Sequence, residues 1–266
     1  MEKIELMLHN WRPSHRCIYI VPEILGDMRS LEVIINRILP LRKFKNQEDT
    51  IVFLGNYING DGKNDKVIDC LINIKNEYKD RAIFLRGTNE ELLLRARNSN
   101  NDFSYWIDNG GLSTIESYIK RAGINSSPNQ ISKSRLHDLI PINHMEFFSS
   151  LEYYRVIDDY CFFHGGFDPG KSILENNINN FVFDFTSSKY VKECLKNKKE
   201  PTLKDNYVFI SHHNYLGKKP LIYQKYFMLG GLAPAKLLVF ELNSMSACAV
   251  SRGKSRIYKY NFDYCD

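Results

Sequence analysis

Five short apolar runs in this chain each end abruptly in a loop that carries Gly, Asn, Glu or His. The runs are rich in β-branched and aromatic residues, a composition that favours β-strands. They comprise residues 18–21, 51–54, 83–85, 160–163 and 207–210. Each loop begins directly after the last residue of its run, so the polar side chains are expected at the ends of strands.

The first three runs are each followed by a helical pattern, and after the first two the apolar residues have the spacing of an amphipathic helix. Leu31, Ile34, Ile35, Ile38 and Leu39 follow the first run, and residues 67, 68, 71 and 74 follow the second. Strands that alternate with helices predict a parallel sheet with right-handed crossovers. Ligands of such sheets bind at the edge where the strands end, so we expect the loops to converge at one site.

The second half of the sequence predicts more strands and fewer helices. Runs at 153–157 and 160–163 flank an Asp158-Asp159 turn as a hairpin, and further strands are expected at 221–223, 227–229, 237–242 and 247–250. The 266 residues are 43% hydrophobic, enough for one large core. We therefore predict an α/β fold (an α+β sandwich), with a parallel first half, an antiparallel second half and two packed mixed β-sheets flanked by helices in one domain over residues 1–266.

The order of the loops resembles that of the calcineurin-like metallophosphoesterases, in particular bacterial PPP-type and diadenosine-tetraphosphatase-like phosphatases. In that family the loops read GDxHG, GDxxDRG, GNHE, NGG, HAG or HGG, and GHT. This chain has LGNYIN at 54–59, RGTNEE at 86–91, NGG at 109–111 and HGGFDPG at 164–170. The resemblance spans about residues 18–242. It implies hydrolysis of phosphoesters by two cations that activate a bridging water.

The first three loops depart from the metal ligands that the resemblance implies. Glu23 and Leu25 stand where the family has Asp and His, and Leu cannot bind a metal. Asn56 stands at the position of the Asp that bridges both metals. Thr88 replaces a metal-binding Asn, and Asn89 replaces the catalytic His. These substitutions indicate that no intact catalytic residue remains.

The remaining positions are more conservative. His164 and His213 match the family's ligand histidines, His212 replaces a glycine, and Asn59 replaces the second Asp of the second loop. The vestigial metal positions are therefore Glu23, Asn56, Thr88, His164 and His213. We expect no bound metal, and Mn²⁺ or another divalent cation only if a single-metal site persists.

A ligand-binding cleft is expected from the polar residues that remain: Glu23, Asn56, Asn59, Arg86, Asn89, His164, His212 and His213. Several roles stay open. His164 either contacts a ligand or donates its ring N–H to a loop carbonyl. Arg86 either binds phosphate or pairs with an acid such as Glu90. Neighbouring side chains on an extended segment face opposite ways, so one of His212 and His213 is expected to face the cleft.

The hypothesis that follows is a catalytically inactive metallophosphoesterase-like protein, a pseudophosphatase, that binds a protein partner or a phosphorylated or nucleotide ligand. Two alternatives remain: a phosphoesterase with an altered single-metal site, and a regulatory subunit that mimics an active phosphatase. If the chain is active, it is a phosphoric ester hydrolase.

Charge and hydropathy restrict the partners. The net charge of +5 is modest. The basic residues at 252–260 could bind nucleic acid, but an edge strand whose charged side chains prevent pairing with other chains explains them as well. We do not expect nucleic-acid binding. No apolar stretch reaches the length of a membrane span, no signal core is found, and the cysteines form no CxxC pair. We expect a cytoplasmic protein that does not bind membranes.

Overall fold

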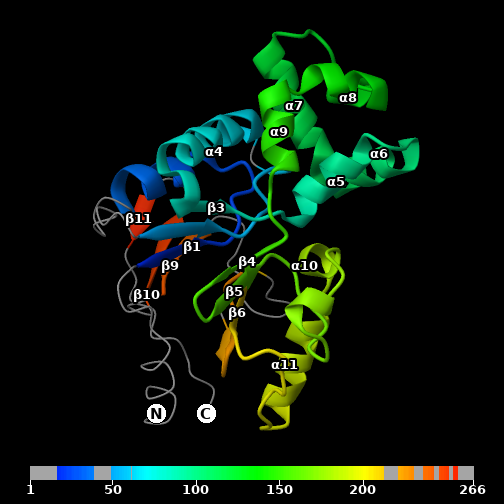
Figure 1. Cartoon of the computed structure of the whole chain (residues 1–266). Coiled ribbons are helices and arrows are strands. Elements are labelled where there is room, and N and C mark those ends of the chain that lie inside the picture. The colour runs from blue at the N-terminus through cyan, green and yellow to red at the C-terminus, as the bar shows by residue number, and fades with distance from the viewer. Residues whose placement is uncertain are drawn as a thin grey trace.

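Two β-sheets pack face to face, and helices cover their outer faces (Figure 1). The computed structural model describes residues 17–38, 49–60, 62–212, 221–230, 236–242, 246–251 and 254–256. The mixed α/β architecture with two mixed sheets and flanking helices confirms the predicted fold class.

The first sheet has the strand order β11-β10-β9-β1-β2-β3. Strands β1, β2 and β3 are parallel, as the helical crossovers predicted, whereas β9 pairs antiparallel with β1 and β10 with β9. Strand β11 lies at the edge of this sheet, in agreement with the edge-strand explanation for part of the basic residues 252–260; residues 252–253 and 257–260 lie outside the described part. The bounds are β1 Ile18–Val21, β2 Thr50–Phe53, β3 Ala82–Phe84, β9 Lys236–Glu241, β10 Ser246–Ser251 and β11 Lys254–Arg256.

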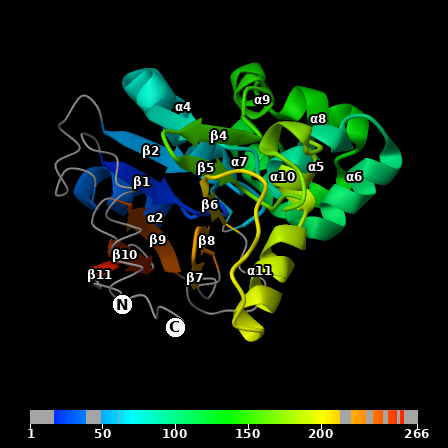
Figure 2. The same ribbon diagram turned by 60° about the horizontal axis from the view of Figure 1, so that its bottom comes forward.

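The second sheet has the order β4-β5-β6-β8-β7 (Figure 2). The predicted hairpin joins β4 and β5 through Asp158 and Asp159. The expectation of an antiparallel second half is wrong in part, because β5, β6 and β8 run parallel while β9 and β10 return to the first sheet. The bounds are β4 Tyr154–Ile157, β5 Tyr160–Phe163, β6 Val208–Ser211, β7 Leu221–Tyr223 and β8 Tyr226–Met228.

The helices fall into groups that are visible in Figure 1. Helices α2 and α4 cover the first sheet, α5 to α9 gather beyond the end of β3, and α10 and α11 lie beside the second sheet. The α-helices are α2 Met28–Val33, α4 Asn64–Tyr78, α5 Thr88–Ala96, α6 Asn100–Trp106, α7 Leu112–Ala122, α8 Lys133–Leu139, α9 Ile142–Ser149, α10 Asn180–Phe183 and α11 Thr186–Lys196. Two π-helical segments are η1 Ile34–Ile38 and η3 Ile107–Gly111, and three 3₁₀ turns are η2 Lys79–Arg81, η4 Pro128–Gln130 and η5 Ile173–Glu175.

Three apolar clusters fill the spaces between these layers. One lies between the first sheet and its helices, one between the two sheets, and one between the second sheet and the segment that contains α10 and α11. Strands buried on both faces require apolar residues at successive positions, which explains why their sequences are continuous apolar runs. No helix within the described ranges combines the length and the apolar character that a membrane span needs.

Candidate functional site

The loops that follow β2 and β3 are held together by one buried carboxylate. Glu90, in the first turn of α5, accepts the N–H groups of Gly87 at 3.0 Å, Asn56 at 2.9 Å, Tyr57 at 2.7 Å and Ile58 at 3.3 Å. Burial raises the pKa of Glu90 to about 7, although the hydrogen bonds from the four N–H groups act in the opposite direction and lower it. Glu90 therefore fixes the positions of the residues at the vestigial metal site.

Asn56, at the expected bridging position, forms hydrogen bonds with other residues of this chain. Its backbone is left-handed (φ 56°), its Oδ1 accepts the N–H of Asn89 at 3.0 Å, and its Nδ2 donates to Glu23 Oε2 at 3.4 Å. Its carbonyl accepts the N–H of Leu25 in the loop after β1 at 2.9 Å. The amide thus joins three loops, and its oxygen is bonded to the N-terminus of α5.

A carboxylate and two histidines meet beside Asn56. Glu23 Oε2 lies 3.0 Å from His212 Nε2, and the rings of His212 and His164 stack with centroids 5.1 Å apart. His164 Nδ1 donates to the carbonyl of Leu54 at 2.7 Å, which confirms the hydrogen bond to a loop carbonyl. Burial raises the pKa of Glu23, but His212, His164 and Asn56 outweigh it and lower the pKa to about 2.

His212 is the histidine that contacts Glu23, whereas His213 lies outside the described residues. The carbonyl of His212 accepts the N–H of Gly230 at 2.7 Å, and a Cβ on Gly230 would lie 2.0 Å from that oxygen. Sequence reasoning missed Gly230, which close packing alone identifies.

Thr88 and Asn89 also bond to the protein itself. The Asn89 side chain, at the position of the catalytic His, donates to the carbonyl of Ile58 at 2.9 Å. The hydroxyl of Thr88 donates to the carbonyl of Val182 in α10 at 3.0 Å. Both side chains therefore connect α5 to neighbouring segments.

Asn59 lies at the side of the site, against the 109–111 segment. Its Oδ1 accepts the hydroxyl of Thr114 at 2.8 Å, and its Nδ2 donates to the carbonyl of Asn109 at 3.3 Å. Gly110 has φ 96°, a left-handed value that glycine adopts without steric cost. Sequence reasoning missed Thr114, whose bond spans 55 residues and has no local signal.

Arg86 is buried and has protein partners. Its Nη1 lies 3.1 Å from Glu91 and 2.8 Å from the hydroxyl of Tyr153, and its Nη2 donates to the carbonyl of Ser149 at 2.9 Å. The acid that pairs with it is Glu91, not the expected Glu90. The guanidinium therefore joins α5 to the connection between α9 and β4.

These side chains do not fit a two-metal centre. The bridging position offers an amide whose oxygen already accepts the N–H of Asn89, and Leu25 offers no donor atom. The carboxylate of Glu23 is bonded to His212 and Asn56. Within the described ranges, no three His, Cys, Asp or Glu side chains are grouped so that they could hold a metal ion.

No protein-family model and no curated protein matches the sequence. Among solved structures, a "putative diadenosine tetraphosphatase" matches with a TM-score of 0.56 and 14% identity, over 90% of this chain and 95% of the other. The hypothetical protein PH1004 from Pyrococcus horikoshii OT3 matches with a TM-score of 0.50 and 13% identity, over 89% and 87%. The chain has the calcineurin-like metallophosphoesterase fold. The family resemblance of the loops is thereby confirmed at the level of the fold.

A metallophosphoesterase from Sphaerobacter thermophilus also matches, with a TM-score of 0.46 and 10% identity, over 92% of this chain and 89% of the other. In the metallophosphoesterase-like fold of this chain, the loops after β1, β2, β3, β5 and β6 converge as expected, as the contacts among Glu23, Asn56, Glu90, His164 and His212 show.

Proposed function

We propose that this chain is a catalytically inactive metallophosphoesterase-like protein that acts by binding a protein partner. The observation that carries the proposal is the amide of Asn56. At the position where the family mechanism needs an anionic oxygen shared by two cations, Asn56 offers a neutral oxygen that is bonded to the N–H of Asn89. A neutral amide cannot offset the charge of two divalent ions.

The contact between Glu23 and His212 supports the same proposal. It joins the loop after β1 to the loop after β6 directly, at an Nε2–Oε2 distance of 3.0 Å. In an active member the metal ions would connect these loops. The contact therefore gives the cleft a cross-link that requires no cation.

A protein partner is favoured over a phosphate-bearing ligand by the surroundings of Arg86. Phosphate recognition requires a guanidinium with donors that are available to the ligand. Two of the Arg86 donor nitrogens are bonded to Glu91, Tyr153 and Ser149. A phosphate would have to displace these partners, whereas a protein surface would not.

The test measures Mn²⁺ binding by calorimetry and turnover of an aryl phosphate, with untagged protein. A variant that restores the family residues (Leu25→His, Asn56→Asp, Thr88→Asn and Asn89→His) provides the matched comparison. We expect the wild type to bind no stoichiometric Mn²⁺ and to show no turnover above a mock preparation. We expect the restored variant to gain Mn²⁺ affinity, because it regains an anionic bridge and two nitrogen or oxygen donors.

Two results would contradict the proposal. Two equivalents of Mn²⁺ on the wild type, with turnover that is lost in His212→Ala, would show that the substituted residues still assemble a catalytic centre. One equivalent with turnover would establish the single-metal phosphoesterase instead.

A further inference from the structure

Strand β4 lies at the edge of the second sheet, with β5 on one side only. Glu152, just before β4, donates its N–H to the carbonyl of Phe84 at 3.1 Å and accepts the N–H of Arg86 at 2.7 Å. Backbone groups alternate in direction along a strand, so those of Tyr154 and Val156 point to the same side as those of Glu152. No described residue is hydrogen-bonded to them there.

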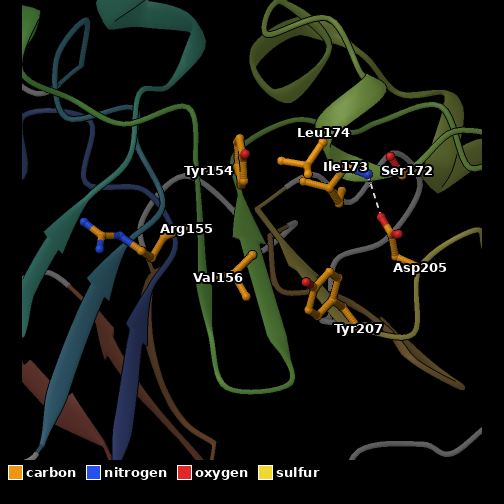
Figure 3. Close-up of a pocket in the computed structure, with 8 residues that line it drawn as sticks. All are labelled: Tyr154, Arg155, Val156, Ser172, Ile173, Leu174, Asp205 and Tyr207. Atoms are coloured by element: carbon orange, nitrogen blue, oxygen red, sulfur yellow. Dashed lines mark hydrogen bonds between the residues drawn. The ribbon is translucent and has the colours of Figure 1, made fainter.

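A pocket of about 410 Å³ adjoins this edge on the outer face of the sheet. Figure 3 shows the side chains of Tyr154 and Val156 on the pocket side, opposite Leu174 and Tyr207, whereas the side chain of Arg155 points away. The remaining lining comes from η5 and the segment before β6. An edge with open backbone groups and an adjoining side-chain pocket has the two elements by which sheets bind extended peptides.

The apolar side chains around the pocket are exposed to a degree that is unusual for their size. Leu174 is 85% exposed and Val156 is 36% exposed, and both side chains line the pocket. Natural edge strands are commonly protected by charged side chains, but Tyr154 and Val156 leave the pocket side of β4 uncharged. Clustered exposed apolar residues mark interaction surfaces more often than single ones do.

The charges around β4 favour a basic partner. Arg155 is neutralised by Glu152, with Nε 2.7 Å from the carboxylate. The exposed carboxylates of Asp158 and Asp159 form the tip of the hairpin, directly after β4. Asp205 lines the pocket, where one of its oxygens accepts the N–H of Ile173 at 2.5 Å. A segment with lysine or arginine near the tip would complement these carboxylates.

We propose that β4 is a docking site for a partner protein, which adds an extended basic segment to the sheet as a further strand. The N–H and C=O groups of Tyr154 and Val156 supply the backbone hydrogen bonds. The pocket receives one bulky apolar side chain of the segment against Tyr154, Leu174 and Tyr207. This inference is independent of whether the cleft hydrolyses phosphoesters.

The test selects peptides from a random dodecapeptide library on the wild-type protein and measures their affinity by fluorescence polarisation. Val156→Pro removes an outward N–H at a position where an edge strand tolerates proline. Leu174→Asp places a charge at the pocket on a side chain that is already exposed. Ile142→Asp is the matched control, because Ile142 is 71% exposed at the start of α9.

We expect the enriched peptides to share one bulky apolar residue and at least one lysine or arginine. Their affinity should fall by about tenfold or more in Val156→Pro and in Leu174→Asp. It should be unchanged in Ile142→Asp. Circular dichroism establishes that each variant is folded before its affinity is compared.

Three outcomes would overturn the proposal. The first is enrichment no greater than on an unrelated protein. The second is equal affinity of the enriched peptides for the wild type and both β4 variants. The third is that no peptide is enriched and the wild type forms dimers in ultracentrifugation that Val156→Pro does not form. That result would show that the edge of β4 binds a second copy of this chain.

Discussion

Two histidine–carboxylate contacts in this molecule have the same length but different surroundings. In the helical region, His144 Nε2 lies 3.0 Å from Asp69 Oδ1, and at the place of the expected cleft His212 Nε2 lies 3.0 Å from Glu23 Oε2. The first joins helices α9 and α4. The second joins the loops after β6 and β1.

The helical contact belongs to a larger network. The other ring nitrogen of His144 is 2.7 Å from the hydroxyl of Tyr118, and Asp69 also pairs with Arg121. Burial lowers the pKa of His144, although Asp69 opposes this. Because Arg121 already neutralises Asp69, His144 can stay uncharged. The side chain of His144 is completely buried.

The cleft contact has different surroundings, namely the stacked ring of His164 and the amide of Asn56. Glu23 has no lysine or arginine partner among the described residues, and His212, His164 and Asn56 lower its pKa. The difference teaches that distance alone does not define the role of a contact. The helical contact joins helices through a buried histidine that also contacts Tyr118, whereas the cleft contact joins two loops.

The largest effect is expected from Glu90→Gln, which would disrupt the hydrogen bonds that hold the loops after β2 and β3 together. Glutamine replaces one acceptor oxygen by an NH₂ group that faces the N–H donors of the loop. We expect a loss of about 3 kcal/mol in the free energy of unfolding in urea at pH 8. Glu77→Gln, on the exposed face of α4, is the control and should change little. Equal effects would show that Glu90 does not fix these loops.

The two histidines should differ in their contribution to stability. We expect His144→Gln to cost about 2 kcal/mol, because it disturbs buried hydrogen bonds to two helices. His212→Gln should cost about 1 kcal/mol, because it disturbs the contact with Glu23, whereas the His144 ring contacts both Asp69 and Tyr118; the carboxylates of Glu23 and Asp69 are equally exposed, at 32%. Urea unfolding of both variants measures the difference. Equal losses of unfolding free energy would show that the two contacts contribute equally to stability.

The smallest effect is a pH dependence. The pKa of Glu23 falls from 4.5 to about 2 on folding, so its ionised form stabilises the fold above about pH 4.5, and this contribution is lost as the pH falls towards 2. After allowance for solvent, we expect about 1 kcal/mol. Glu23→Gln should lack this loss, so the stability difference between wild type and variant should shrink from pH 5 to pH 3. A constant difference would show that His212 does not hold Glu23 ionised.

The sequence predicted the strands well because strand burial on both faces leaves a continuous apolar signal. Ile18–Val21 and Tyr160–Phe163 match β1 and β5, and the other strands are offset at most by one residue at either end. The pairing partners were harder. Strand β9 pairs with β1 and β10 pairs with β9, so both belong to the first sheet. Both sheets are apolar, and local residue types do not specify which of them a strand joins.

The family fold and the loss of most metal ligands were evident from the sequence alone, because loop motifs and side-chain types are local properties. What the replacement side chains do was decided only by the tertiary structure. Asn56 bonds to Asn89 across 33 residues, and His212 meets Glu23 from a different sheet. Such contacts depend on how the loops converge. Convergence is set by the packing of the two sheets, which no local stretch of sequence records.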